Sequence, residues 1–354
     1  MNDKSPYIPT LSASDISIRL NERLVSIGKS WLKGIHVIPS ELTENKGWYE
    51  SGNEDVGQQE LNELLGRLAT DFIARELTNT LMVNQYDYDT KTRRLCKRPI
   101  QEKNVSGEKV CGREKGTAFR IGLATGSTIF QLVDSLDVIS VLCSVDIAPL
   151  VIGPVPETRY SAGFIADLFV RRFRAQEPAR INLLNVGKIT YQTSVTKDAR
   201  KQQFIAIQLF PECSALRDND KPTELGKGMA DYFDWVVTGI GAWGKGQLDV
   251  HVNKIYATGD KPTGVVGDVC SRPFDHNGKE LPLTKATSDM FVAISFEAME
   301  KMCTIQGKGK RVIAIAGGKE KYAAIRTLLV RDKPLFNVLV TDELTARRLL
   351  VDLE

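Results

Sequence analysis

Hydrophobic residues recur at helical spacing along the N-terminal quarter of the chain. Between Ser14 and Trp31 they return every three or four positions, and Ser14–Asp15 can cap the start of that helix. The strongest pattern lies between Gln58 and Leu77, where one apolar stripe is made by Leu61, Leu64, Leu65, Leu68, Ala69, Phe72, Ile73 and Leu77. Such a stripe predicts an amphipathic helix that packs one face on a core.

From Phe119 onward the pattern changes to short apolar runs that alternate with helical segments. Together with one strand near the N-terminus, it predicts strands at 35–39, 119–124, 145–152, 181–184, 234–240, 265–269, 312–315 and 338–340. Helices are predicted at 128–136, 162–173 and 319–329 and after the last strand, while 204–209 fits either element. Strands that are apolar throughout are typical of parallel sheets, so we expect an α/β fold with a mostly parallel sheet covered on both faces.

The composition is that of a globular protein. Hydrophobic residues make up 42% and charged residues 26% of the 354 residues, which excludes a mainly disordered chain. The net charge of +3 does not by itself indicate nucleic-acid binding. The N-terminus lacks the apolar run of a signal peptide, and no stretch reaches about 18 uninterrupted apolar residues. We therefore expect a cytoplasmic protein with no membrane partner.

Neither the cysteines nor the histidines form a metal or cofactor motif. The six cysteines contain no C-x-x-C pair, and the three histidines lie far apart in the sequence. We therefore predict no cofactor and no bound metal.

Residues 90–116 differ from the rest of the chain in charge. This window holds nine basic and three acidic residues and few aliphatic ones. We expect a surface insertion at about residues 84–117, with a hairpin that turns near Ser106–Gly107. A solvated loop is the simplest interpretation. Contact with a nucleic-acid backbone or a partner is the alternative, for which the candidate residues are Arg93, Arg94, Lys97 and Arg98.

Small and polar residues follow four of the predicted strands, at the edge where open α/β sheets bind ligands. The first group is Thr125, Gly126, Ser127 and Thr128. Gly126 allows close approach of an anion to the backbone, the two hydroxyl side chains can donate to it, and the next helix adds its N-terminal N–H groups. The group matches neither a P-loop nor a dinucleotide fingerprint. It predicts a phosphate or sugar-phosphate site, with plain helix capping as the alternative.

A second group is rich in glycine. Gly239, Gly241 and Gly244 have the spacing of G-x-G-x-x-G, but no convincing helix begins after them. We therefore expect Gly239 and Gly241 to pack a loop closely against a ligand, and we do not expect a nicotinamide site.

The last two groups carry charge. Asp268 follows Gly267 at a strand end, where it can accept hydrogen bonds from sugar hydroxyls or simply begin a turn. Lys321 follows Gly317–Gly318 in the first turn of a helix. A lysine at that place suits a second anion, attacks an aldehyde if its pKa is depressed, or is merely solvated.

These motifs, in this order, resemble the effector-binding domain of the SorC family of bacterial sugar-responsive transcriptional regulators. No single motif is specific, but their order and spacing are. The resemblance implies a three-layer α/β/α sandwich related to the sugar-phosphate isomerase/deaminase fold, with residues 1–19 as a lead and 20–350 as the sugar-binding domain. It rests on Leu20–Leu24, His36–Pro39, Leu64–Gly66, Thr125–Thr128, Thr238–Gly241, Gly267–Asp268, Phe274–Gly278, Ala316–Gly318, Lys321 and Leu339–Glu343.

The resemblance also implies a ligand and its contacts. Members of the family bind phosphorylated sugars, which alters operator affinity or oligomeric state, and they are commonly dimers or tetramers. By position, Thr125–Thr128 would hold a phosphate, Asp268 a sugar hydroxyl, and Lys321 the sugar or a second phosphate. Some members carry an arginine for a second phosphate where Ile152 stands here, and Arg159 is the residue of this chain that could take that role.

Two features depart from the family pattern. A helix-turn-helix of roughly fifty residues normally precedes this domain, and residues 1–18 are too short to form one. We therefore expect an effector domain that has lost its DNA-binding part, or one truncated from a longer protein. The basic insertion is the second departure, because it separates the helix around Gly66 from the strand at Phe119.

We accordingly expect a non-catalytic sugar-phosphate sensor, a homo-oligomer that acts through its assembly or through DNA or a DNA-binding partner. An isomerase- or deaminase-like enzyme is the first alternative, with Asp268, His276, Asp342 and Glu343 as candidate general bases. No carboxylate pair or His–carboxylate spacing favours it. Direct nucleic-acid contact through the basic insertion is the second alternative.

Overall fold

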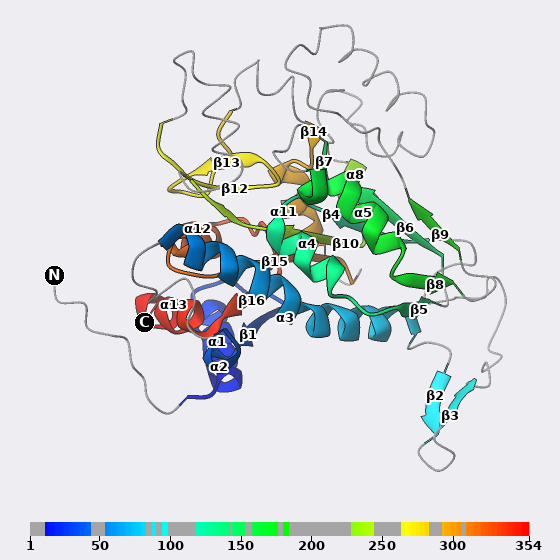
Figure 1. The fold of residues 1–354 in the computed structure, drawn as a ribbon. Helices are drawn as coiled ribbons and strands as arrows, with labels where there is room; N and C mark the ends of the chain where they lie inside the picture. Colours follow the sequence, from blue (N-terminus) through cyan, green and yellow to red (C-terminus); the bar gives the residue numbers. More distant parts are fainter. Residues whose placement is uncertain are drawn as a thin grey trace, which may run out of the picture.

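A seven-stranded parallel sheet forms the centre of the computed structural model (Figure 1). The structure describes residues 11–43, 54–82, 86–89, 94–97, 118–141, 144–152, 158–175, 180–183, 228–243, 263–282, 292–305 and 309–353. The strand order is β1-β16-β15-β10-β4-β6-β9, and every neighbouring pair is parallel. The strands are β1 (Gly34–Ile38), β4 (Phe119–Leu123), β6 (Val145–Pro149), β9 (Ile181–Leu183), β10 (Trp235–Gly239), β15 (Arg311–Ile315) and β16 (Val338–Asp342).

Helices cover both faces of the sheet, and alternate strand residues point into two separate cores. In β15, Val312 and Ala314 belong to one core, whereas Ile313 and Ile315 belong to the other. The predicted three-layer α/β/α sandwich is therefore confirmed. The first core is covered by α1 (Ala13–Ser26), α8 (Gly228–Tyr232), α11 (Phe296–Thr304), α12 (Tyr322–Val330) and α13 (Glu343–Leu353), and the second by α3 (Glu54–Met82), α4 (Ser127–Asp134) and α5 (Ala162–Val170).

The 29-residue helix α3 spans much of the second face. The apolar stripe predicted for it is buried, including Leu61, Leu65 and Ile73. At Gly66 the helix comes very close to α4, because a Cβ there would lie 2.1 Å from the carbonyl oxygen of Thr128. Only glycine permits this approach, so the packing of α3 fixes the position of the first turn of α4.

A small antiparallel sheet lies beyond the carboxyl ends of the central strands. Its strands β12 and β13 are joined by a two-residue turn in which Cys270 and Ser271 have φ values of 52° and 61°. The buried Sγ of Cys270 lies 3.4 Å from Oγ1 of Thr238 in β10, so the turn is anchored to the central sheet. The three strands are β11 (Gly241–Ala242), β12 (Val265–Val269) and β13 (Arg272–Asp275).

The remaining described elements are short. They form three strand pairs, a short helix and a 3-10 helix, and no described helix is long and apolar enough to cross a bilayer. They are α2 (Ser40–Thr43), η1 (Thr158–Tyr160), β2 (Tyr86–Asp89) with β3 (Arg94–Lys97), β5 (Ile139–Val141) with β8 (Phe173–Ala175), and β7 (Val151–Ile152) with β14 (Val292–Ala293).

The first helix starts and ends earlier than predicted. It covers Ala13–Ser26, and its N-cap is Ser12. The Ser12 hydroxyl accepts the N–H of Asp15, while the Asp15 carboxylate accepts the N–H of Ser12, which makes a reciprocal capping box. This reciprocal pair is more favourable than the predicted cap at Ser14–Asp15. At the other end Gly28 has a φ of 85°, which turns the chain out of the helix well before Trp31.

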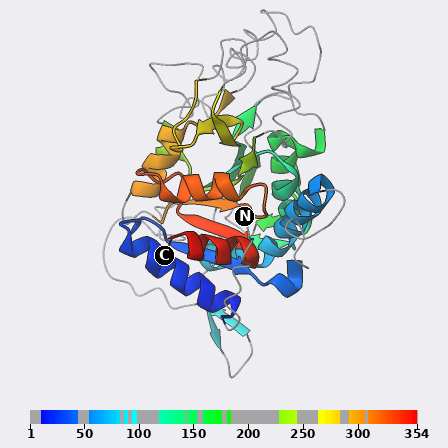
Figure 2. The same cartoon turned by 90° about the vertical axis from the view of Figure 1, so that its left-hand side faces the viewer.

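The described part of the predicted basic insertion contains a hairpin, at a different place from the predicted one. Tyr86 pairs with Lys97 and Asp89 pairs with Arg94, so this hairpin turns between residues 89 and 94. The turn predicted near Ser106–Gly107 lies outside the described residues, as does the undecided segment 204–209. The β2–β3 hairpin projects away from the three layers beyond the end of α3 (Figures 1 and 2).

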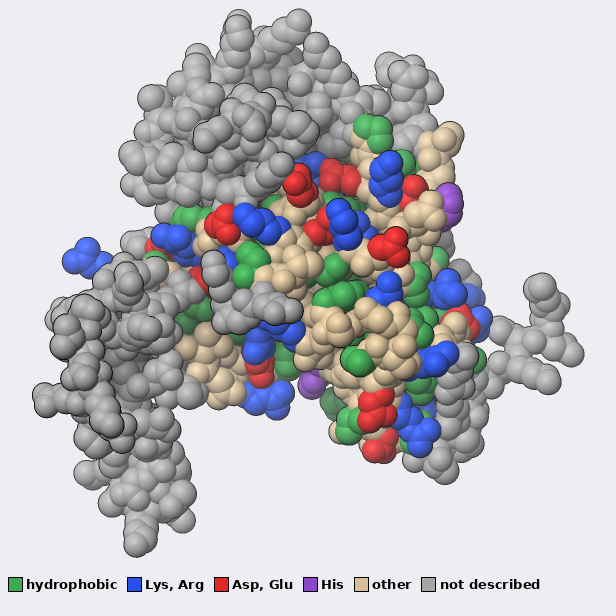
Figure 3. Space-filling model, turned by 180° about the vertical axis from the view of Figure 1, so that it is seen from behind, with side chains coloured by type: hydrophobic (Ala, Val, Ile, Leu, Met, Phe, Trp, Pro, Cys, Tyr) green, Lys and Arg blue, Asp and Glu red, His purple; other side chains and the backbone are tan. Residues whose placement is uncertain are grey.

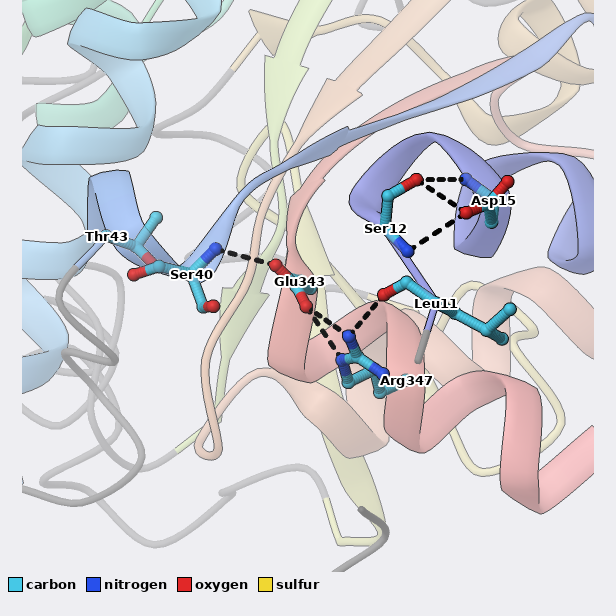
Figure 4. A network of polar contacts seen from close by, with 7 residues as sticks. All are labelled: Leu11, Ser12, Asp15, Ser40, Thr43, Glu343 and Arg347. Carbon is cyan, nitrogen blue, oxygen red and sulfur yellow. Dashed lines mark hydrogen bonds and ion pairs between the residues drawn. The ribbon is translucent and has the colours of Figure 1, made fainter. Parts of the chain in front are cut away.

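A buried carboxylate joins three segments of the first core that are distant in sequence (Figure 4). Glu343, at the start of α13, accepts the backbone N–H of Ser40 at 2.8 Å and two hydrogen bonds from the guanidinium of Arg347. Arg347 also donates to the carbonyl oxygen of Leu11. The contact holds the entry of α1 and the end of β1 against α13, which packs beside α1 (Figure 2).

Neutralising this carboxylate should destabilise the protein. Replacing Glu343 by Gln leaves the half-buried Arg347 without its charge partner, which should cost about 1–3 kcal/mol at neutral pH in the free energy of unfolding measured with urea. Burial raises the pKa of Glu343, but the hydrogen bonds from Ser40 and Arg347 outweigh it and hold the pKa below its ordinary value of 4.5.

The contribution of Glu343 to stability should depend on pH in a defined direction. A carboxylate whose pKa is lowered by folding contributes stability above its unfolded pKa and loses it as the pH falls through the folded pKa. The difference between the wild type and Glu343→Gln should therefore be largest at neutral pH and should shrink below about pH 4.5. A difference that is independent of pH would contradict the assigned role.

Candidate functional site

The strand order of the central sheet reverses between β4 and β10. From β4 the chain continues outward through β6 and β9, and from β10 it continues in the other direction through β15 and β16. Ligand sites of open parallel sheets form beyond the carboxyl ends of the strands at such a reversal. Val237 in β10 lies opposite Leu123 in β4, so the segments that follow, Gly239–Gly241 and Thr125–Thr128, begin side by side.

The segment Thr125–Thr128 turns from β4 into α4. Gly126 is the N-cap residue and has a φ of 115°, a backbone conformation that residues with side chains rarely adopt. No side chain caps this helix. The first amides of a helix have no intrahelical partner, so an anion beyond β4 would meet the N–H groups of Ser127 and Thr128. Ser127 is half-buried and Thr128 is buried.

Tyr160 of η1 supports this turn. The carbonyl oxygen of Tyr160 accepts the N–H of Gly126 at 3.1 Å, and its ring packs edge-on against Phe130, with centroids 5.6 Å apart. Arg159 is exposed, and its guanidinium lies 4.6 Å from the centre of the Tyr160 ring. The structure thus places Arg159 next to the support of the Gly126 turn.

Gly241, Asp268 and Lys321 come together on the other side of the reversal. Gly241 pairs with Asp268 across β11 and β12, and a Cβ on Gly241 would lie 2.0 Å from Oδ1 of Asp268. The carboxylate therefore lies directly over the glycine. Burial lowers the pKa of Lys321 to about 8, against the opposing effects of the Asp268 and Glu320 carboxylates. Asp268 and Lys321 are thus close enough to interact, although they come from different elements.

The turn before Lys321 is anchored by a second carboxylate. Gly318, with a φ of 93°, donates its N–H to Oδ2 of Asp342 at 2.9 Å and to Oγ1 of Thr345 at 2.8 Å. Thr345 donates in turn to both carboxylate oxygens of Asp342. Burial raises the pKa of Asp342, and these hydrogen bonds oppose that effect. Asp342 therefore holds the backbone of the lysine turn.

The four candidate general bases have different surroundings. Asp342 is occupied by the lysine turn, and Glu343 by Ser40 and Arg347. His276 is exposed in the turn after β13, with Nε2 3.2 Å from Nδ2 of Asn277. Of the four, only Asp268 lies at the reversal. The described residues also contain no cluster of His, Cys, Asp and Glu that could hold a metal ion.

Of the basic residues proposed for nucleic-acid contact, two lie in the β2–β3 hairpin. Arg94 and Lys97 are the first and last residues of β3, whereas Arg93 and Arg98 fall outside the described residues. On the face shown in Figure 3, basic and acidic side chains are intermixed over the described surface. That surface carries no patch of a single sign of charge.

Sequence reasoning missed the residues that support the site. Tyr160, Thr345 and Gln58 hold the turns that carry the candidate residues, and none of them stood out as a strand-end motif. One signal was present for Gln58: it lies three residues before Leu61 and seven before Leu65, on the apolar stripe of α3. A polar residue at a stripe position is a reason to look for a specific partner.

Two glycines of the site should respond differently to an added methyl group. In Gly241→Ala the new Cβ overlaps Asp268 and should push its carboxylate away from Lys321. The pKa of Lys321 should then fall below about 8, because Asp268 raises it. In Gly239→Ala the nearest atom is the carbonyl oxygen of Ile315 at 3.8 Å, so this variant is the matched control.

The measurement is the pH dependence of lysine modification, followed by mass spectrometry of the peptide that contains Lys321. We expect the midpoint to move down in Gly241→Ala and to stay in place in Gly239→Ala. An unchanged midpoint in Gly241→Ala would show that the carboxylate does not act on the lysine.

Comparison with known proteins agrees with this architecture. Residues 224–351 match the model of a family described as "Putative sugar-binding domain". A search of curated proteins gave no match. Among solved structures, the chain is similar to the full-length sorbitol operon regulator SorC from Klebsiella pneumoniae, with 18% identity, a TM-score of 0.53, and 97% of this chain and 82% of that chain covered.

Two further structures are similar over nearly their whole length. A transcriptional regulator from Streptococcus pneumoniae is 18% identical with a TM-score of 0.54, and 96% of this chain and 97% of that chain are covered. A DeoR family transcriptional regulator from Listeria monocytogenes is 13% identical with a TM-score of 0.55, and 95% and 99% are covered. The expected resemblance to the SorC effector domain is thus supported: residues 224–351 match the sugar-binding domain model, and the chain has the fold of these regulator structures.

Proposed function

We propose that this chain is a sugar-sensing domain of a transcriptional regulator, which binds a phosphorylated sugar without converting it. The observation that carries the proposal is the proximity of Asp268 to Lys321 at the strand-order reversal, beyond the same sheet edge as the uncapped N-terminus of α4. One side of the site offers N–H and hydroxyl donors, and the other offers a carboxylate and an amine. A sugar phosphate has matching groups at its two ends.

The chemistry assigns each end of the ligand to one side. A phosphate suits the first turn of α4, where backbone N–H groups and the helix dipole favour negative charge. The hydroxyls of Ser127 and Thr128 would add donors there. Sugar hydroxyls suit Asp268, because an ionised carboxylate accepts hydrogen bonds. Lys321 would donate to a sugar oxygen or to a second anionic group. Arg159 would reach the ligand only from the outer side of Tyr160.

A binding role fits the side chains better than a catalytic one. Isomerases and deaminases need a general base that is free to take a proton. Among the four candidates, Asp342 and Glu343 are engaged in the packing of the fold, and Asp268 faces a lysine. The solved structures similar to this chain are regulators. We infer that ligand binding changes assembly of the chain or its affinity for DNA or a DNA-binding partner.

A thermal-shift screen tests the proposal directly. The probes are glucose 6-phosphate, fructose 6-phosphate, ribose 5-phosphate, fructose 1,6-bisphosphate, the corresponding free sugars and inorganic phosphate. A compound at 100 times its dissociation constant stabilises the folded state by about 2.7 kcal/mol, which raises the melting temperature visibly. We expect a phosphorylated sugar to stabilise the protein more than its free sugar, and to be recovered unchanged after incubation.

Variants assign the stabilisation to the site. Ser127→Ala and Lys321→Met should each weaken binding of the stabilising sugar phosphate about tenfold or more, since charge-assisted hydrogen bonds contribute about 1.5–3 kcal/mol. Lys319→Met removes an exposed lysine two residues away and should leave the affinity unchanged. Consumption of the compound would instead support the enzyme alternative, and no stabilisation by any phosphorylated compound would remove the phosphate assignment.

The affinity should also depend on pH in a defined direction. Burial lowers the pKa of Lys321 to about 8, so the amine is charged below that pH and neutral above it. Binding of a sugar phosphate should therefore weaken as the pH rises from about 7 to about 9.5, a range in which ordinary lysines stay charged. Titration calorimetry at several pH values measures this, and the decline should be absent in Lys321→Met.

A further inference from the structure

Gln58 of α3 makes a specific contact with the turn that leads to Lys321. Its Nε2 donates to the carbonyl oxygen of Gly317 at 2.9 Å and to Oδ1 of Asn62 at 3.1 Å. The carboxamide also lies close to the next residue, because a Cβ on Gly318 would be 2.3 Å from Oε1 of Gln58. The lysine turn is therefore held from two sides, by Asp342 with Thr345 and by Gln58.

Among the described residues, the oxygen of this carboxamide has no hydrogen-bond partner. Gln58 is only 4% exposed, and its buried Oε1 accepts no hydrogen bond from the described residues. Exchanging Oε1 and Nε2 would not help, because Oε1 would then face the oxygens of Gly317 and Asn62. A buried acceptor without a donor lowers stability and offsets part of what the two hydrogen bonds of Nε2 contribute. The contact of Gln58 with Gly317 therefore comes at a cost in stability.

The same helix also touches the phosphate side of the candidate site. Gly66 is in close contact with the carbonyl oxygen of Thr128, and it follows Gln58 by eight residues. Eight residues of helix span roughly 12 Å, so α3 sets a fixed spacing between the two turns. The ligand proposed above needs its phosphate and its hydroxyl groups bound at once, which makes this spacing a determinant of binding.

We propose that Gln58 is a positioning residue of the sugar site: it fixes the Gly317–Gly318 turn, and through it Lys321, at a set distance from the first turn of α4. The site assignment rests on the proposed function, whereas the effect of Gln58 on the lysine turn does not depend on any ligand. Gln58 acts through the backbone of the turn and need not touch the ligand itself.

The test without ligand uses Gln58→Leu and, in case that variant folds poorly, Gln58→Asn, whose shorter side chain does not reach the carbonyl of Gly317. The control is Gln59→Leu, because Gln59 is exposed and bonds only to Glu63 in the described structure. Two quantities are measured: the pH midpoint for reductive methylation of Lys321, and the rate of amide hydrogen exchange in a peptide that contains Gly318.

Release of the turn should expose Lys321 to water. Because burial is the main cause of its lowered pKa, the midpoint should rise from about 8 toward the ordinary value of 10.5 in the Gln58 variants. Exchange of the Gly318 amide should become about tenfold faster or more, while Gln59→Leu behaves as the wild type. A merely structural role would lower the melting temperature without moving either local quantity, and that result would overturn the proposal.

A second arm separates this proposal from the proposed function. The four sugar phosphates of the screen are titrated into the wild type, Gln58→Leu, Lys321→Met and the double variant. If Gln58 acts through Lys321, Gln58→Leu weakens binding about tenfold on its own but adds little in the Lys321→Met background. Additive effects would contradict the positioning role. If none of the four binds the wild type, the sugar-phosphate assignment fails, and the ligand-free measurements still decide the role of Gln58.

Discussion

The common direction of the seven central strands is the constraint on which the rest of the molecule depends. Parallel strands buried on both faces require helical crossovers, and all their carboxyl ends meet at one edge. The order of the strands reverses between β4 and β10, so the chain leaves these two neighbours in opposite directions. The turns after them cannot both be covered by the same crossover. The topology therefore places these two turns at the edge where open parallel sheets bind ligands.

The candidate site at that edge depends on the close approach of other groups to the backbone of glycines. Gly241 allows the carboxylate of Asp268 to lie against the backbone, and Gly66 allows α3 to lie against the first turn of α4. Gly318 adopts a positive φ that lets its N–H reach Asp342. In each case the absence of a side chain on glycine allows a polar group to approach the backbone closely. The turns of the candidate site are thereby held in place by the elements packed against them.

The sequence predicted the fold well because the strongest signals were periodic. The alternation of apolar runs with helical segments located the central strands, and the stripe from Leu61 to Leu77 located α3. The strand-end motifs of the candidate site were visible because they follow those strands directly. The start of α1 was misplaced, because Ser12 and Asp15 cap each other while Ser14 is an equally acceptable cap residue by type.

The partners of the supporting residues could not be predicted, for a different reason. Gln58 lies 259 positions from Gly317, and local patterns contain no information on such a pair. The pairing of Asp268 with Lys321 depends on how β12 packs beside α12, which the sequence fixes only through the whole tertiary structure. Long-range polar contacts are set by packing, so they become visible only when the packing is known.

In the proposed sensor, the proximity of Asp268 to Lys321 also favours one orientation of the sugar phosphate. Burial disfavours the charged form of Lys321, and a nearby negative charge stabilises that form. Asp268 already supplies one such charge. A phosphate placed there would regain the attraction of the lysine but would meet the repulsion of the carboxylate. The first turn of α4 offers donors and, within the turn itself, no acidic side chain. In the proposed sensor the phosphate is therefore favoured at α4, and we expect the mixed charges of Asp268 and Lys321 to bind the neutral, hydroxyl-bearing end of the sugar.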